Sequence, residues 1–258
     1  MKTRTLITAM ALFIIASGVV VYLGCNGEGP CCPEIVEEMK AMPLWICPLC
    51  PDSGARLFYK ISYQKQTDKG LQPCDPSTKT LELKNLETNK VIQGNFFEKH
   101  ATIPGVYQNP SGGAFIQVNK TSTIELTAIG EKGCDLKTST CVVKVVEVGS
   151  YHDLCFPYTD PHAGSMQGSW TGNTKIFGFG VVVQSVENIN KSRVTINVTH
   201  NGVTAMNLAP RTHSNVHNGL PANGQWTLEI PDNAQYQKFI NSGEKSLCVR
   251  VYITCKCN

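Results

Sequence analysis

Cys47 and Cys50 form the spacing in this sequence that is most closely tied to chemistry, a Cys-x-x-Cys pair with Trp45 nearby. In such a pair the surroundings can lower the pKa of one thiol, and the resulting thiolate can act as a redox nucleophile. The same thiolates, joined by Cys31 or Cys32, could also hold a zinc ion. Against both activities, no βαβ pattern follows the pair, and adjacent cysteines are poorly spaced as metal ligands.

The total of 12 cysteines favours structural disulfides over either activity, because disulfides persist mainly in oxidising compartments outside the cytoplasm. Cys134 and Cys141 flank the tip of an expected hairpin, so we predict a bridge between them. We predict two more bridges between the cysteines at 31–32 and those at 47–50, each stabilising the fold by about 3 kcal/mol through loop closure. The cysteines that we expect in disulfides are Cys31, Cys32, Cys47, Cys50, Cys134, Cys141, Cys248 and Cys255.

Among the six histidines, His213 and His217 lie four residues apart. On a helix this spacing would place both imidazoles on one face, as in known metal sites. His200, at the end of an expected strand, would be the third ligand. The segment that holds the pair is typical of a loop and has no acidic residue between the two histidines. We therefore expect solvated histidines, no bound metal and no cofactor.

Motifs of catalysis and nucleotide binding are missing from the sequence. It contains no Gly-x-Ser-x-Gly motif, no phosphate-binding P-loop, no dinucleotide-binding glycine pattern and no EF-hand. The residue types of a catalytic triad are supplied by Ser165 with His152 or His162 and Asp153 or Asp160. A triad is defined, however, by geometry rather than by closeness in sequence. We therefore expect that the protein is not an enzyme.

Three aromatic residues near two glycines, Trp170, Phe177 and Phe179, are candidates for ligand binding. Exposed on one strip, they could stack on sugar rings or bind a protein partner. We expect that at least two of them pack in the core instead.

The composition describes a chain that folds around a sizeable core. The 258 residues are 41% hydrophobic and 17% charged, which allows one or two domains. The formal net charge is +3, with no run of five or more like charges, so the sequence has no electrostatic footprint for binding nucleic acid.

The N-terminal segment predicts export. Lys2 and Arg4 precede an apolar run from Leu6 to Leu23, which is typical of an export signal. The run ends at Gly24-Cys25, which resembles a bacterial lipoprotein signal, and the resemblance implies cleavage before Cys25 and a lipid on that cysteine. With Cys25 lipidated, 11 cysteines remain, so one thiol is free or intermolecular. An uncleaved membrane anchor and ordinary secretion are the alternatives, and all three place the folded chain outside the cytoplasm.

Residues 25–53 are rich in cysteine and proline and predict a stiffened tether. Within it, Ile35, Met39 and Met42 follow helical spacing, so we expect one short helix over Glu34–Met42.

The rest of the chain alternates between apolar and polar residues in short segments separated by turns, as in Leu57, Tyr59, Ile61 and Tyr63. This period of two predicts an all-β protein with two β-sandwich domains, at 54–148 and 149–258.

Two segments resemble known families. The expected hairpin from Thr123 through Cys134 to Val145 resembles the last strands of bacterial immunoglobulin-like or PKD-type domains, which implies a sandwich of the adhesive or spacer kind. The segment Asn223–Ile230 resembles a strand of the jelly-roll P domain that accompanies some secreted proteases.

Together these features predict an exported, membrane-anchored, non-catalytic protein of the outer membrane or cell surface that serves adhesion, scaffolding, or envelope or filament assembly. Other surface proteins or glycans are its expected partners, and the final strand, Leu247 to Thr254, could pair with a second subunit through an open edge. Two alternatives stay open. One is a secreted hydrolase or its accessory carbohydrate- or ligand-binding domain, and the other is a periplasmic redox or metal-handling lipoprotein using Cys47 and Cys50.

Overall fold

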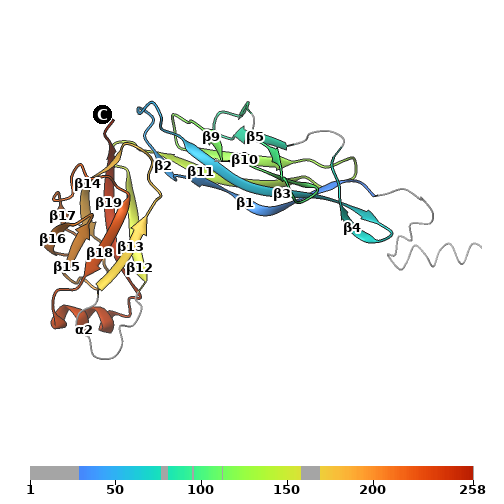
Figure 1. Ribbon diagram of the computed structural model, residues 1–258. Helices are drawn as coiled ribbons and strands as arrows, with labels where there is room; N and C mark the ends of the chain where they lie inside the picture. Colours follow the sequence, from blue (N-terminus) through green and yellow to red (C-terminus); the bar gives the residue numbers. More distant parts are fainter. Residues whose placement is uncertain (1–28, 77–80, 95, 112, 158–168, 258) are drawn as a thin grey trace, which may run out of the picture.

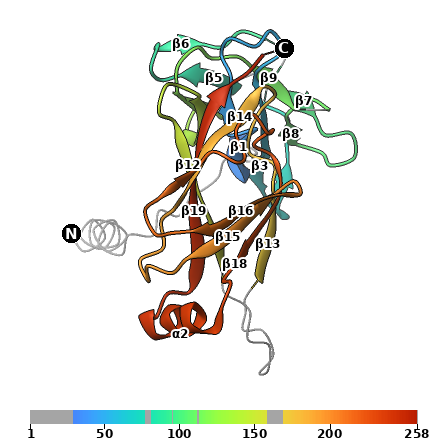
Figure 2. The same cartoon turned by 90° about the vertical axis from the view of Figure 1, so that its left-hand side faces the viewer.

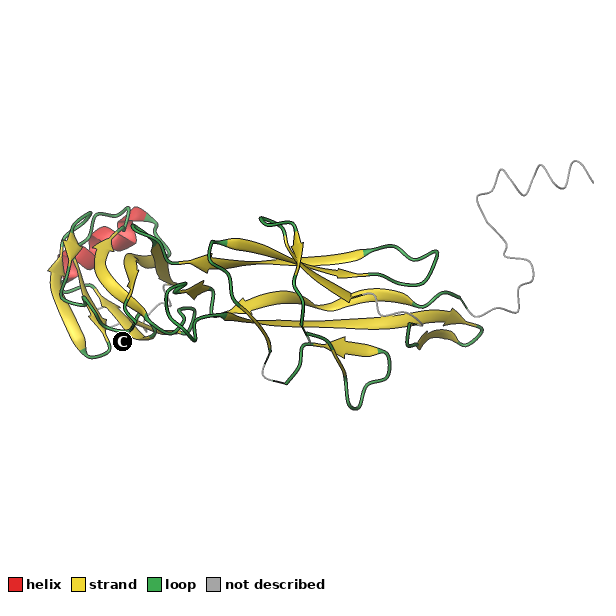
Figure 3. Ribbon diagram, turned by 90° about the horizontal axis from the view of Figure 1, so that it is seen from above, coloured by secondary structure: helices red, strands yellow, loops and turns green. Residues whose placement is uncertain are grey.

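The computed structural model describes residues 29–76, 81–94, 96–111, 113–157 and 169–257. The described chain forms two stacked pairs of β-sheets that are joined at one end and set at an angle to each other (Figures 1 and 3). A single helix, α2 (Asn233–Ser242), accompanies the strands in the described residues. The predicted all-β class is confirmed.

The first pair of sheets is built from strands in the N-terminal half of the chain. One sheet has the order β1-β3-β8-β7, with β4 and β9 also paired to β3, and the facing sheet has the order β2-β11-β10-β5-β6. The strands of the first sheet are β1 (Cys32–Met42), β3 (Ala55–Thr67), β4 (Gly70–Pro73), β7 (Glu98–Lys99), β8 (Val106–Gln108) and β9 (Ala114–Ile116). Those of the facing sheet are β2 (Trp45–Ile46), β5 (Leu81–Asn85), β6 (Lys90–Val91), β10 (Ser122–Ala128) and β11 (Lys137–Val145).

The core of this pair follows the predicted alternation of β3. Leu57, Tyr59, Ile61 and Tyr63 are all buried, because successive side chains of a strand point to opposite faces of the sheet. They pack against the inward side chains of the facing sheet, among them Ile124 of β10.

Residues 32–42 form a strand, so the prediction of a helix over Glu34–Met42 is wrong. β1 pairs antiparallel with β3 from Cys32 opposite Gln64 to Met42 opposite Arg56. Two register shifts, one on each side of Glu37, interrupt the ladder and disturb strict alternation along β1. The prediction of a tether is likewise wrong for residues 32–42 and 45–46, which belong to the sheets. Pairing with β3 outweighs the weak helical periodicity.

The second pair of sheets comes from the C-terminal half. One sheet has the order β12-β19-β14-β17 and the other β13-β18-β15-β16. Their strands are β12 (Tyr151–Pro157), β13 (Ser169–Thr174), β14 (Val181–Asn188), β15 (Ile196–His200), β16 (Val203–Leu208), β17 (His213–Ser214), β18 (Gly224–Glu229) and β19 (Ser246–Cys255).

Helix α2 covers the end of the second pair of sheets that points away from the first pair (Figure 2). The Asp232 side chain caps its N-terminus by accepting a hydrogen bond from the backbone N–H of Gln235. Gly243 ends the helix at a φ of 73°, a left-handed conformation that glycine adopts without steric cost. Phe239 packs the helix against the core, and its ring centroid lies 5.8 Å from that of Trp170.

The last strand lies inside a sheet. β19 pairs along one side with β12 and along the other with β14. The prediction that Leu247–Thr254 offers an open edge to a second subunit is therefore wrong, since both rows of its backbone groups are already paired.

The two pairs of sheets meet at β2. Trp45 packs into the core of the second pair and Ile46 into the core of the first, because neighbouring residues of a strand face opposite sides. Backbone hydrogen bonds continue across the junction, from Trp45 N–H to the Ile176 carbonyl (3.0 Å) and from Gly178 N–H to the Trp45 carbonyl (2.7 Å). Gly178 suits this close approach, because a Cβ there would lie only 2.9 Å from the Trp45 oxygen.

Candidate functional site

Among the described residues, ten cysteines are joined in five disulfides, in a pattern that differs from the expected one. Cys134, which was expected to pair with Cys141, is bonded to Cys32 at the start of β1. Cys141 lies opposite Ile124 in the body of the β10–β11 ladder, well away from the hairpin tip. The five pairs are Cys31–Cys74, Cys32–Cys134, Cys47–Cys255, Cys50–Cys257 and Cys155–Cys248.

The Cys-x-x-Cys pair is divided between two bridges. Cys47 is bonded to Cys255 and Cys50 to Cys257, so the predicted bridges from 31–32 to 47–50 are wrong. In this state neither sulfur is a thiolate available for redox attack or for zinc. Among the residues that the structure describes, no group of three or more potential ligands could hold a metal ion.

Cys141 is the free cysteine of the described residues, and it is half-buried. Burial raises the pKa of its thiol to about 12, so very little reactive thiolate is present at neutral pH. Cys25, the predicted lipid attachment site, lies outside the described residues.

Of the three histidines considered as metal ligands, His200 and His217 come together, with ring centroids 6.1 Å apart, and His213 lies elsewhere. His200 and His217 are both fully buried, and the His200 ring stacks on Trp226 with ring centroids 3.8 Å apart. His213 lies instead on the exposed β17, with its ring 5.2 Å from that of Tyr252. The expectation of solvated histidines is therefore wrong for His200 and His217, which are core residues.

The buried histidine pair predicts that the protein loses stability in acid. Burial lowers the pKa of His200 and of His217 below the ordinary value of 6.5, so both favour the neutral form in the fold. In the unfolded chain they take up protons as the pH falls below 6.5, and the free energy of unfolding therefore decreases from there down through the folded pKa values. His152, whose pKa burial also lowers, adds to the same slope.

Urea unfolding of the wild type and of His217→Gln at pH values from about 5 to about 8 measures this effect. We expect a smaller pH dependence in the variant, because one titrating group is removed. An unchanged slope in His217→Gln would contradict the assignment.

The aromatic candidates separate into two buried residues and one exposed residue. Trp170 and Phe177 are core residues, exposed by 5% and 2%, whereas Phe179 is 67% exposed. The expectation that at least two of the three pack in the core is confirmed. These residues form no common strip for a ligand.

A different aromatic cluster, not singled out from the sequence, lies on the outer face of the β12-β19-β14-β17 sheet. Tyr151 stands opposite Tyr252, and Asp153 stands opposite Arg250, on neighbouring strands. We call this surface the tyrosine face, defined by Tyr151, Asp153, Glu187, His213, Arg250 and Tyr252. The signal for it is in the sequence, since Arg250 and Tyr252 alternate with the core residues of β19.

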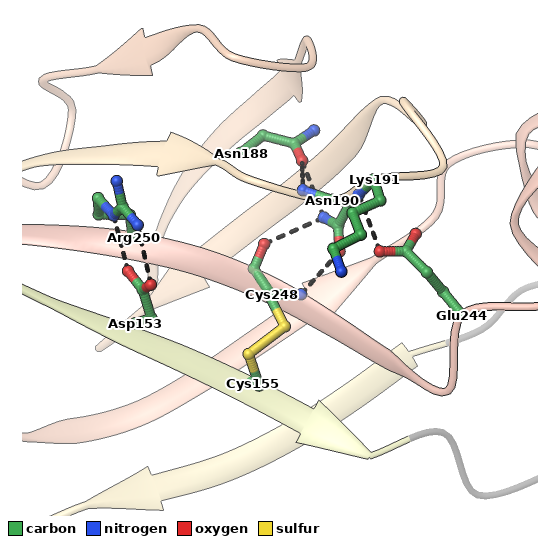
Figure 4. The surroundings of a disulfide bond; sticks show 8 residues. All are labelled: Asp153, Cys155, Asn188, Asn190, Lys191, Glu244, Cys248 and Arg250. Atoms are coloured by element: carbon green, nitrogen blue, oxygen red, sulfur yellow. Dashed lines mark hydrogen bonds and ion pairs between the residues drawn. A yellow bond between two sulfur atoms is a disulfide. The ribbon is translucent and has the colours of Figure 1, made fainter. Parts of the chain in front are cut away.

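The charged groups of the tyrosine face are bound to one another. Arg250 donates from Nε to Oδ1 of Asp153 (2.8 Å) and from Nη2 to Oδ2 (2.9 Å), as Figure 4 shows. These bonds lower the pKa of the Asp153 carboxyl. The guanidinium carbon of Arg250 also lies 4.1 Å from the centroid of the Tyr151 ring, and the Tyr252 hydroxyl donates to Oε2 of Glu187 (2.9 Å). Each charged group is thus held in a fixed position.

The disulfide next to these charges fixes the strands that carry them. Cys155 and Cys248 are directly opposite each other in the β12–β19 ladder and are bonded (Figure 4). The Asn190 side chain continues the connection, because its Nδ2 donates to the Cys248 carbonyl (3.0 Å) and its Oδ1 accepts from the Cys248 N–H (2.8 Å). Asn190 is itself bonded to Asn188, which is fully buried.

The first pair of sheets contains a cavity of about 480 Å³, lined in part by Tyr63, Leu83, Phe97 and Tyr107. A size and lining of this kind are typical of small-molecule sites. Pro76 and Leu81, which precede and follow the undescribed residues 77–80 in the sequence, also line it.

Comparison of this chain with protein-family models, with curated proteins and with solved structures gave no match. The resemblances to lipoprotein signals, to immunoglobulin-like or PKD-type domains and to the P-domain strand therefore stay predictions. In the described ranges, no helix combines the length and apolar character needed to span a membrane. The fold and the site define an all-β, disulfide-bonded protein with a rigid polar and aromatic sheet surface.

Proposed function

We propose that this chain is an exported, membrane-anchored, non-catalytic surface protein that serves adhesion or scaffolding by holding its second pair of sheets away from the membrane. The observation that carries the proposal is the place in the fold where the described residues begin. The described residues begin at Gly29, whose N–H donates to the Gln66 carbonyl (2.9 Å) near the β3–β4 hairpin. This hairpin lies at the end of the first pair of sheets that is opposite the second pair (Figure 1). An anchor that precedes Gly29 therefore leaves the second pair outermost.

A rigid junction supports the same role. The Cys47–Cys255 and Cys50–Cys257 disulfides tie the loop after β2 to the C-terminal end of β19. Lys144 adds a cation–π contact, with its Nζ 5.1 Å from the centroid of the Trp45 ring. Five disulfides also suit a protein that works in an oxidising compartment.

The cysteine count is consistent with a lipid on Cys25. Of the 11 cysteines that follow it, ten are paired and Cys141 is free. Cys141 is the odd thiol that lipidation requires, and its burial makes it a poor partner for an intermolecular bridge.

The proposal is tested by the intact mass of the protein extracted from its native membrane, measured before and after reduction with alkylation. We expect a chain that begins at Cys25 and carries acyl groups, with ten cysteines alkylated only after reduction. The Cys25→Ser variant should lack the acyl mass and leave the membrane fraction. A chain that keeps its first 24 residues, or Cys25 found in a disulfide, would contradict the lipid anchor.

Surface exposure is tested separately, by labelling intact cells with an amine-reactive reagent that does not cross membranes. We expect label on lysines of the second pair of sheets, such as Lys191 and Lys238. Label that appears only after the cells are broken would contradict a surface position.

A further inference from the structure

We propose that the tyrosine face binds a neutral glycan chain, and this inference rests on the proposed function, since it needs the second pair of sheets to face the exterior. Three rings lie in a continuous row on this face. The ring centroids of Tyr151 and Tyr252 are 5.8 Å apart, and those of Tyr252 and His213 are 5.2 Å apart. Tyr151 is 45% exposed and His213 is exposed, so ring surface is available to stack on the apolar faces of sugar rings.

The charges on the face favour a neutral ligand. Arg250 is already neutralised by its two hydrogen bonds to Asp153, so it offers little to an anionic partner. Asp153 and Glu187 still have acceptor capacity, because an ionised carboxylate has about four lone-pair sites. Neighbouring sugar hydroxyls are hydrogen-bond donors of the kind that such fixed carboxylates accept.

A hollow of about 400 Å³ opens beside Tyr252, the middle ring of the row. Gln184, Ser185 and Thr254 contribute to its lining. Their side chains make no hydrogen bond within the described part of the chain, which leaves one amide and two hydroxyls for a ligand. A substituent on the sugar unit that stacks on Tyr252 would reach into this hollow.

The polar character of the outer face of the β12-β19-β14-β17 sheet favours a glycan over a protein partner. Tyr151 is the one large hydrophobic side chain that is exposed on β12, β14, β17 and β19, all of which are described. The fully buried centre of a protein interface is more apolar than this surface. The face is also held rigid by the Cys155–Cys248 disulfide and the β-ladders, so little conformational freedom is lost on binding.

The test is native gel electrophoresis of the full protein in gels that contain one soluble polysaccharide each. The neutral probes are hydroxyethylcellulose, galactomannan, arabinoxylan, mannan and dextran, and alginate is the anionic comparison. We expect retardation by at least one neutral polysaccharide, with an apparent affinity at least about tenfold lower in Tyr151→Ala and in Tyr252→Ala. Phe179→Ala, which removes an exposed aromatic ring outside the face, should bind as the wild type does.

Two further measurements keep the outcomes distinct. Thermal unfolding of each variant verifies that it is folded, and Tyr252→Phe, which keeps the ring, should retain binding within about threefold of the wild type. No retardation by any neutral polysaccharide, retardation by alginate alone, or equal retardation of the alanine variants would each overturn the inference. A lipidated, surface-exposed protein that binds none of the probes would overturn this inference and leave the proposed function standing.

Discussion

We expect that removing both disulfides at the junction, Cys47–Cys255 and Cys50–Cys257, lowers the free energy of unfolding by more than about 5 kcal/mol. Removing either disulfide alone should cost about 2 kcal/mol. All substitutions are from cysteine to serine, so each single removal is a double variant and the removal of both is a quadruple variant. The two bridges span sequence separations of 208 and 207 residues. While one of these bridges remains, the large loop between the end of β2 and the end of β19 stays closed. The second bridge then closes only the small ring that lies between the two bridges. The costs are therefore not additive.

Urea unfolding of the wild type, the two double variants and the quadruple variant measures these differences. Small-angle X-ray scattering gives a second readout, because the quadruple variant should lose the fixed angle between the two pairs of sheets. The matched control is Cys155→Ser with Cys248→Ser, which removes a bridge inside the second pair of sheets. It should lower stability without changing the shape, and a quadruple variant that scatters as the wild type does would argue against a junction held by these bridges.

Trp226→Ala is expected to lower the free energy of unfolding by about 4 kcal/mol. Trp226 is fully buried in the second pair of sheets, where His200 stacks on one face and His217 lies beside it. Truncation removes the largest apolar surface of this cluster and leaves a cavity between two buried imidazoles.

Chemical unfolding, with Met206→Ala as the control, measures the effect. Met206 lies on β16 in the same pair of sheets but is 65% exposed, so its loss should cost less than about 0.5 kcal/mol. Trp226→Phe should cost less than the alanine variant, because the indole Nε1 makes no hydrogen bond within the described residues. A loss below about 1 kcal/mol in Trp226→Ala would contradict the central role of this cluster.

Several features of the protein could be predicted from the sequence because their signal is local. The alternation in β3 predicts a half-buried strand, since side chains of period two fall on opposite faces wherever the strand is placed. The same alternation in other segments gave the all-β class. The number of cysteines predicted disulfides, because it reflects the redox conditions of the compartment and needs no knowledge of the fold.

The features that were predicted wrongly depend on which strands become neighbours. Residues 34–42 follow helical spacing in isolation, but antiparallel pairing with β3, interrupted by two register shifts, makes them a strand. The last strand was predicted to offer an open edge to a second subunit, yet β19 lies between β12 and β14 in its sheet. Pairing of this kind joins distant segments, and a local pattern does not encode it.

The candidate site also depends on tertiary structure. The residue types of the tyrosine face are visible in the sequence, but Tyr151 and Tyr252 are 101 positions apart, and only the β12–β19 register makes them neighbours. The disulfide pattern has the same origin, since bridges with separations from 43 to 208 residues form where folding brings two sulfur atoms into contact. The sequence by itself determined the all-β class and the abundance of disulfides, while the route of export stays a prediction. The tertiary structure alone decided which cysteines, rings and charges meet, because strand register and sheet packing set those distances.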